Sequence, residues 1–140
     1  MKIGVLTYHI DLNPGATLQC YATCRALKEI GHEVFVIDLE HYNGSPYSLS
    51  AILSKIINHG NMRRQMCFIK KSFPPFTMHY KSIEGLRSNP PQMDAYCIGS
   101  DQVWNLDIAG QSHMAYFLDF GSERVKRFSY ASSIGNCPAA

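Results

Sequence analysis

The sequence predicts an α/β protein with an open, mostly parallel sheet in three layers, and three observations carry this prediction. Four short apolar segments have the length and composition of strands. A helical pattern lies between the first two segments and completes a strand–helix–strand unit of the usual length. A right-handed crossover places these two strands parallel and adjacent, with the helix on one face of the sheet.

The strand–helix–strand unit occupies residues 2–39. Residues 2–8, KIGVLTY, are typical of a buried strand, and the polar loop HIDLNPG follows them. Between residues 16 and 30 apolar side chains recur at helical spacing, and Gly31 provides the C-terminal stop. Residues 32–39, HEVFVIDL, form the second predicted strand.

The pattern changes after Asp38. Residues 41–91 are rich in proline, with two predicted helices near residues 49–58 and 62–71, and we expect an irregular helical insertion there. Strand character returns at residues 93–100 and again at residues 125–135. The whole chain of 140 residues is therefore expected to form a single α/β domain with a Rossmann-like sheet.

Composition limits the classes of function. The chain is 46% hydrophobic and 17% charged, and no apolar run approaches the roughly 20 residues that span a membrane. The first residues show no apolar stretch leading to a small-residue cleavage site, so we expect a cytoplasmic protein without a transmembrane segment.

Charge argues against a dedicated nucleic-acid binder, because the net charge is only +2. Residues 55–87, however, contain seven basic residues and a single acidic one, Glu84. Such a stretch is either a solvated helix face or a surface that attracts an anionic polymer or a phosphorylated substrate.

The five cysteines predict neither a disulfide framework nor a metal site. Their number is odd, and they form no CxxC pair or zinc spacing. Cys20 and Cys24 share one helix face, which suits either a redox pair or a packed core, and we assign them to the core.

Polar clusters follow the predicted strands at their carboxyl ends, where parallel α/β sheets bind ligands. The candidate binding residues after the first strand are His9, Asn13, Gly15 and Gln19, those after the third are Gly99, Ser100, Gln102 and Asn105, and Ser133 follows the fourth. Asp101, in the stretch GSDQVWN, is the candidate acid–base or sugar-hydroxyl contact. In the alternative interpretation Ser100 or Asp101 only caps a helix and Trp104 packs on the core.

Dinucleotide cofactors are poorly supported. The loop NPGATLQ has one glycine and no GK[ST], so it is neither a dinucleotide fingerprint nor a P-loop. Asp38 stands where an acid would hold a ribose, but without the glycines we interpret it as structural. His9 and His113 can titrate near neutrality, yet lone loop histidines are more often hydrogen-bonding residues.

Taken in order, these motifs resemble the polysaccharide pyruvyl transferases. The matching stretches are NPGATLQCYA at 13–22, LKEIGHEVFVID at 27–38, DAYCIGSDQVWN at 94–105, YFLDF at 116–120 and SYASSIG at 129–135. Pro14 departs from the family, which usually has an aromatic residue there.

The resemblance implies a two-lobed, glycosyltransferase-like (GT-B-like) architecture, of which this chain is the N-terminal lobe. It implies transfer of pyruvyl from phosphoenolpyruvate to sugar hydroxyls as a ketal, on a glycan or lipid-linked acceptor in cell-surface polysaccharide synthesis, without a cofactor. Asp101 would act as base or stabilise the cationic carbon, and residues 13–16, including Ala16, would offer N–H groups to phosphate.

Family members continue into a second α/β half, whereas this chain ends at NCPAA. We therefore expect the chain to be truncated, inactive alone, and prone to self-association through the surface left by the missing lobe. The alternative function is a catalytically silent module that binds a sugar or a nucleotide.

Overall fold

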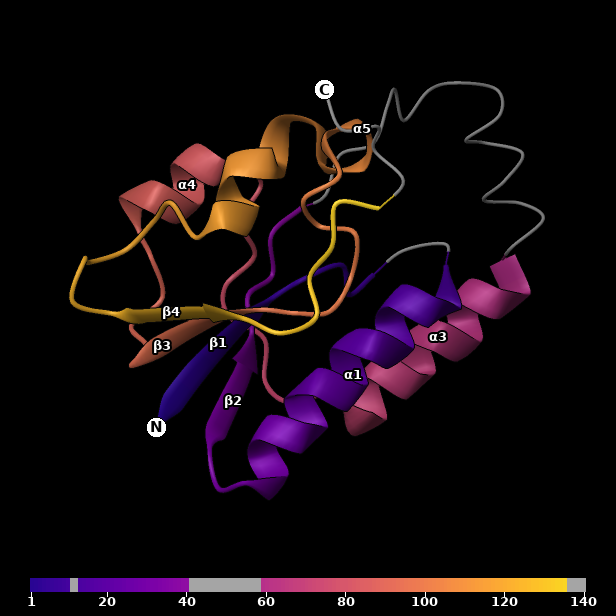
Figure 1. Ribbon diagram of the computed structural model, residues 1–140. Helices are drawn as coiled ribbons and strands as arrows, with labels where there is room; N and C mark the ends of the chain where they lie inside the picture. The colour runs from indigo at the N-terminus through magenta and orange to yellow at the C-terminus, as the bar shows by residue number, and fades with distance from the viewer. Residues whose placement is uncertain (11–12, 41–58, 136–140) are drawn as a thin grey trace.

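A four-stranded parallel sheet forms the centre of the molecule. The computed structural model describes residues 1–10, 13–40 and 59–135. The strands are β1 (Lys2–Leu6), β2 (Glu33–Val36), β3 (Ala95–Ile98) and β4 (Lys126–Ser129), in the spatial order β2-β1-β3-β4. Every neighbouring pair is parallel, which confirms the predicted open α/β sheet (Figure 1).

Helices lie on both faces of this sheet and complete the three layers. One face carries α1 (Pro14–Glu29), with α3 (His59–Ser72) lying beside it (Figure 1). The other face carries α4 (Ile83–Ser88) and the 3₁₀ helix η1 (Gly110–Phe117), which follows the short α5 (Leu106–Ala109). The helix predicted at residues 62–71 is confirmed by α3, and the one predicted at 49–58 lies outside the described residues.

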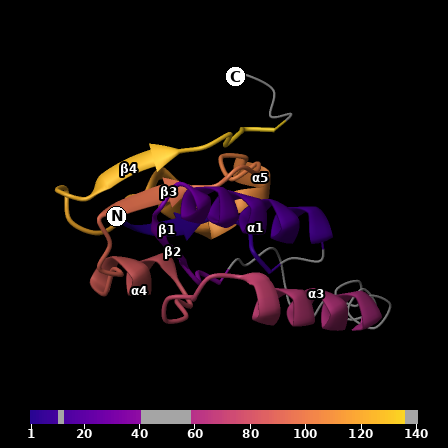
Figure 2. The same cartoon turned by 90° about the horizontal axis from the view of Figure 1, so that it is seen from below.

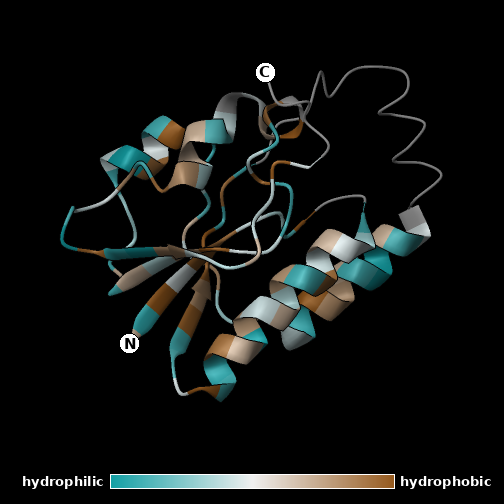
Figure 3. Cartoon of the chain, viewed as in Figure 1, coloured by the Kyte–Doolittle hydropathy of each residue, from teal (hydrophilic) through white to brown (hydrophobic). Residues whose placement is uncertain are grey.

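Alternation along the strands builds a separate core against each helical layer. In β3, Ala95 and Cys97 pack with Cys20 and Cys24 of α1, while Tyr96 and Ile98 face the layer of α4 and η1. All four residues of β3 are buried, as expected for a strand covered on both faces. Apolar residues accordingly lie in the covered strands β1, β2 and β3, and many polar ones lie along the outer surfaces of α1 and α3 (Figure 3). The assignment of Cys20 and Cys24 to the core is confirmed.

Residues 73–80 add an element that the sequence did not predict. Isolated parallel bridges join Val36 to Phe76 and Leu39 to Tyr80. The Val36 amide donates to the Pro75 carbonyl over 3.0 Å, and the Tyr80 amide donates to the Asp38 carbonyl over 2.7 Å. Counted in chain order with this segment, the sheet runs 3-2-1-4-5, which matches five of the six strands in the Rossmann order 3-2-1-4-5-6.

The described part of the predicted insertion therefore packs into the main core. Ile69, Tyr80, Ile83 and Leu86, all from residues 59–91, are buried. Residues 73–80 pair with the end of β2, and α4 covers one face of the sheet, so this part of the insertion contributes to the main core. Pairing between distant segments leaves little local signal in a proline-rich stretch.

The observed strands are shorter than the predicted ones. The first was expected at 2–8 and is Lys2–Leu6; the fourth was expected at 125–135 and is Lys126–Ser129. The chain stays buried after β1 ends, at Thr7, Tyr8 and His9. These residues form a packed loop and not a continuation of the strand. None of the helices in the described ranges is long and apolar enough to cross a bilayer.

Strand β4 is exposed throughout and lies at the edge opposite α3 (Figure 2). Arg127 anchors it: the guanidinium donates to the carbonyl oxygens of Leu118 and Phe120 over 3.0 and 2.8 Å. The same group lies 5.9 Å from the ring centroid of Tyr96. Charged side chains on an edge strand also disfavour pairing with another sheet.

Candidate functional site

The carboxyl ends of the strands form the candidate site. The chain leaves β1 toward β2 on one side, and β3 lies on the other, so the sheet reverses its order between β1 and β3. Loops diverge at such a point and leave a crevice. The predicted site residues after β1, β3 and β4 all lie at this edge of the sheet.

Asp101 lies in the loop after β3 and is half-buried. One carboxylate oxygen accepts the Gln102 amide over 2.7 Å. The next helix, α5, begins at Leu106, and the Ala109 amide donates to the Asn105 carbonyl over 2.8 Å. Asp101 is thus too far back to cap that helix, so the capping alternative does not describe it.

The loop after β4 is bonded to the loop after β3. The Ser133 amide donates to the Asp101 carbonyl over 2.9 Å, and the Trp104 amide donates to the Ser133 carbonyl over 3.2 Å. The Asn105 side-chain amide donates to Gln102 over 3.3 Å. The structure therefore brings together Asp101, Gln102, Asn105 and Ser133, as the sequence predicted.

Trp104 packs beneath this loop. Its ring stacks on Phe117 with centroids 6.0 Å apart and an interplanar angle of 6°. Its indole N–H donates to the Tyr116 carbonyl over 2.8 Å. The aromatic residue therefore supports the loop that carries Asp101, and this part of the alternative interpretation is confirmed.

Gly99 and Ser100 are buried at the start of the same loop. A Cβ at Gly99 would lie 2.9 Å from the Thr7 Cβ, closer than real Cβ atoms approach. The glycine is thus required by packing against the end of β1.

Asn13 is the N-cap of α1. Its side-chain oxygen accepts the Gly15 amide over 2.9 Å, and its backbone carbonyl accepts the Ala16 amide over 3.2 Å. Pro14, at the first helical position, has no N–H. The amides of Gly15 and Ala16 are therefore bonded within the helix cap, and the expectation that residues 13–16 offer N–H groups to phosphate stays a prediction. Gln19 is half-buried one turn further along α1.

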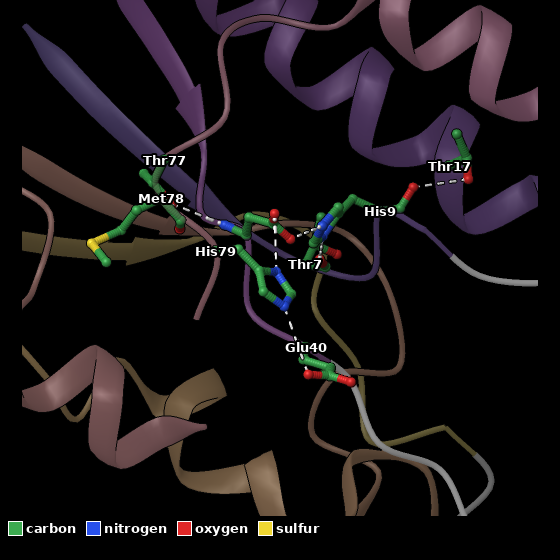
Figure 4. A network of polar contacts seen from close by, with 8 residues as sticks. Thr7, His9, Thr17, Glu40, Thr77, Met78 and His79 are labelled. Atoms are coloured by element: carbon green, nitrogen blue, oxygen red, sulfur yellow. Dashed lines mark hydrogen bonds and ion pairs between the residues drawn. The ribbon is translucent and has the colours of Figure 1, made fainter. Parts of the chain in front are cut away.

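A cluster that the sequence did not predict lies beside these loops and consists of His9, Asp38 and His79. We call these residues, with the cavity that they line, the His–Asp–His pocket. His9 Nε2 lies 3.1 Å from one Asp38 carboxylate oxygen, and His79 Nδ1 lies 3.2 Å from the other (Figure 4). The second ring nitrogen of His79 lies 3.7 Å from a Glu40 carboxylate oxygen. Two imidazoles thus flank one carboxylate.

Contacts from three parts of the chain hold the cluster. His9 Nδ1 lies 3.1 Å from the Thr7 carbonyl oxygen, and the Thr17 hydroxyl of α1 donates to the His9 carbonyl over 3.0 Å. The Asp38 amide donates to the Thr77 hydroxyl over 3.1 Å. Both ring nitrogens of His9 thus face oxygen atoms, which fixes the orientation of the ring.

The electrostatics of Asp38 follow from this arrangement. The hydrogen bond from His9 holds the pKa of the Asp38 carboxyl below its ordinary value, and the charges of His9 and His79 act in the same direction. Partial burial opposes this effect without cancelling it. Asp38 therefore stays a carboxylate at neutral pH.

A cavity of about 230 Å³ opens onto the cluster. Its lining includes His9, Asp38, His79 and the tyrosines Tyr8 and Tyr116, whose rings meet edge to face 5.2 Å apart. A larger hollow of about 360 Å³ lies along α1 beside Tyr21, away from the strand ends. We take the smaller cavity as the candidate site because it lies where α/β sheets place ligands.

Sequence reasoning noted two of the three members but interpreted them separately. His9 and Asp38 follow adjacent parallel strands, a signal that could have paired them. His79 could not have been found, because it reaches Asp38 only through the pairing of residues 73–80 with the end of β2. His113 stays apart: its ring faces the Gly110 carbonyl of its own helix at 2.9 Å.

Within residues 1–10, 13–40 and 59–135, no group of three His, Cys, Asp or Glu side chains is arranged to hold a metal ion. The His–Asp–His pocket is accordingly a hydrogen-bonding cluster. Its chemistry is that of a carboxylate between two imidazoles, able to bind hydroxyl groups and to exchange protons.

Comparison with known proteins bears on the whole chain. A search of curated proteins finds no match. The family model described as polysaccharide pyruvyl transferase matches residues 13–139. This range begins at the N-cap of α1 and includes every described residue after it. It includes Asp101, Gln102, Asn105 and Ser133 at the carboxyl edge. This match covers nearly the whole chain, and the chain therefore belongs to the polysaccharide pyruvyl transferase family.

Proposed function

We propose that this protein acts in the transfer of pyruvyl from phosphoenolpyruvate to two hydroxyl groups of a sugar, giving a ketal in polysaccharide synthesis. The observation that carries the proposal is the family match over residues 13–139. The position of Asp101 supports it, since this half-buried carboxylate lies at the sheet edge where ligands bind.

The reaction defines what the site must supply. The methylene carbon of phosphoenolpyruvate gains a proton, two sugar oxygens bond to the adjacent carbon, and the bond from that carbon to the phosphate oxygen breaks. The two sugar hydroxyls lose two protons. One proton offsets the proton gained by the methylene carbon, and the other leaves with phosphate. Such a site needs a group that accepts a hydroxyl proton and a negative charge that stabilises the cationic carbon.

Asp101 suits both of these roles, and its loop suits the sugar. Gln102, Asn105 and Ser133 surround it with amide and hydroxyl groups that bond to hydroxyls. At the start of α1, Asn13 occupies the N–H groups of Gly15 and Ala16. Attraction of phosphate there would act through the positive end of the helix.

The test is Asp101→Asn in this protein. Turnover should fall roughly 10²-fold or more, the scale of a lost acid–base group, because the amide neither accepts the proton nor carries the charge. The melting temperature should change little, since Asp101 is half-exposed. Phosphate release and ketal product, measured with a panel of sugars, report turnover.

Trp104→Ala provides the structural counterpart. Loss of the stacked ring and its hydrogen bond should cost about 3 kcal/mol of unfolding free energy and lower activity by disordering the loop. Full activity in Asp101→Asn would remove that residue from the site. If sugars bind but none of them leads to phosphate release from phosphoenolpyruvate, a sugar-binding module would replace the transferase.

A further inference from the structure

We propose that the His–Asp–His pocket is the subsite that holds the hydroxyl groups of the acceptor sugar. The identification of the sugar as the acceptor rests on the proposed function, whereas the binding of a polyhydroxylated ligand follows from the pocket itself. Three features carry it: the orientation of the cluster, the charge around it and its position beside the loop of Asp101.

The three side chains form a gradient from the interior to the mouth of the cavity. The exposed fractions are 6% for His9, 23% for Asp38 and 48% for His79. His9 therefore fixes the carboxylate from the buried side, and His79 meets it from the solvent side. A carboxylate fixed by a buried donor loses little conformational entropy when it accepts hydrogen bonds from a ligand.

The lining side chains bear on the class of ligand. Asp38 and Glu40 line the cavity together with His9 and His79, and a phosphate or carboxylate group would meet like charge at the two carboxylates. Hydroxyl groups suit this lining, because they donate to carboxylates and accept from imidazole. The buried rings of Tyr8 and Tyr116 add apolar walls of the kind that small-molecule sites combine with a few polar groups.

The size of the cavity agrees with a small ligand. At about 230 Å³ it lies below the roughly 300–1,000 Å³ of sites for drug-sized molecules. We therefore infer that it takes one sugar ring or the edge of one, with the rest of a glycan outside.

The position of the pocket connects it to the loop of Asp101. Tyr116 lines the cavity, and its carbonyl accepts the Trp104 indole N–H over 2.8 Å. Tyr116 thus joins the wall of the pocket to the base of the loop after β3. A sugar held by Asp38 and His79 would lie on the same edge of the sheet as the proposed catalytic carboxylate.

The test is a binding experiment followed by NMR of the histidine ring protons. The probes are the methyl glycosides of galactose, glucose and mannose, with phosphoenolpyruvate and inorganic phosphate as anionic comparisons. At least one glycoside should shift the His79 and His9 ring signals, whereas the anions should not. His79→Gln and Asp38→Asn should each weaken binding of that glycoside at least tenfold.

A folding check and one control variant accompany these tests. His79→Gln changes a half-exposed side chain, so its folding is expected to match wild type, and its melting temperature checks this. His32→Gln changes a histidine just before β2, at the opposite end of the strands, and should leave glycoside affinity unchanged.

The outcomes separate this proposal from the proposed function. Glycosides that bind with no shift at His9 or His79, unchanged affinity in folded His79→Gln, or no glycoside binding at all would overturn the pocket assignment. Phosphate release with an unaltered sugar dependence in His79→Gln would overturn it too while leaving the transferase intact. Glycoside binding lost in both variants, with no transfer from phosphoenolpyruvate to any sugar, would uphold the pocket and overturn the transferase.

Discussion

Asp38 shows how one residue couples stability to pH. Its pKa in the folded protein is lowered, chiefly by the hydrogen bond from His9. The unfolded chain therefore binds more protons than the folded one as pH falls. The stabilisation by Asp38 is complete above the ordinary carboxyl pKa of about 4 and disappears as pH falls through the lower folded value.

We expect Asp38→Asn to lower the unfolding free energy by about 1–2 kcal/mol at pH 7, the scale of a partly exposed charged hydrogen bond. The difference from wild type should shrink as the pH is lowered from 5 toward 2. Urea unfolding across this range measures it, with Glu123→Gln on an exposed turn as the control. A difference that stays constant down to pH 2 would contradict the coupling to His9.

Gly99 gives a second prediction at the scale of a single residue. Gly99→Ala places a Cβ 2.9 Å from the Thr7 Cβ, and overpacking of this kind costs about 1–3 kcal/mol. Thr7→Gly should recover part of that loss in a double-mutant cycle measured by urea unfolding. The matched control is Gly60→Ala in α3, where an added Cβ meets no atom within 4 Å. Wild-type stability in Gly99→Ala would show that Thr7 does not require the glycine.

At the scale of elements, α1 and α3 differ in the burial of their cysteine side chains. Cys20 and Cys24 of α1 are buried against the sheet, and Cys67 of α3 is exposed. The pKa of Cys20 is raised well above its ordinary value, mainly by its hydrogen bond with Cys24 and by burial. Burial raises the pKa of Cys97 in β3 to about 12. Since the thiolate is the reactive form, these buried thiols should be inert in the folded protein.

A thiol-labelling experiment tests this difference in a Cys137→Ser background, because Cys137 lies outside the described residues. One thiol should react rapidly with a disulfide reagent, and Cys67→Ser should abolish that rapid phase. The remaining three should react only after unfolding in urea. Rapid labelling of Cys20 or Cys24 in the folded protein would contradict the packing of α1.

For the whole molecule, the order of the sheet predicts an order of stability. β1 and β3 are central and buried, whereas β4 is exposed at one edge. Amide hydrogen exchange should therefore be slowest in β1 and β3 and faster in β4. The amides of Thr77 and Tyr80 should also be protected, because they donate to the carbonyls of Val36 and Asp38 over 2.9 and 2.7 Å. Exchange at residues 76–80 as fast as in an open loop would reject the five-segment order.

Charge is also distributed unevenly over the molecule. Residues 41–83 contain six lysines and arginines and no acid, although the whole chain carries only +2. Arg63, Arg64, Lys70 and Lys71 of α3 are exposed, in agreement with the predicted solvated helix face. The attraction of an anionic polymer or a phosphorylated substrate to this surface stays a prediction.

The sequence by itself determined the parallel α/β sheet, the α1 crossover and the loop of Asp101. These features have local signals: short apolar runs, a 3.6-residue period ending at Gly31, and polar clusters directly after strands. The contact of Asp101, Gln102, Asn105 and Ser133 followed from them, because the carboxyl ends of neighbouring parallel strands meet at one edge.

Only the tertiary structure decided which polar groups are already engaged and which distant ones meet. It showed that Asn13 occupies the N–H groups at the start of α1 and that Gly99 is required by Thr7. It also brought His79 to Asp38, through pairing of residues 73–80 with the end of β2. The stretch PPFTMHY has no strand alternation of its own, so its place depends on hydrogen bonds across the fold, which no local pattern records.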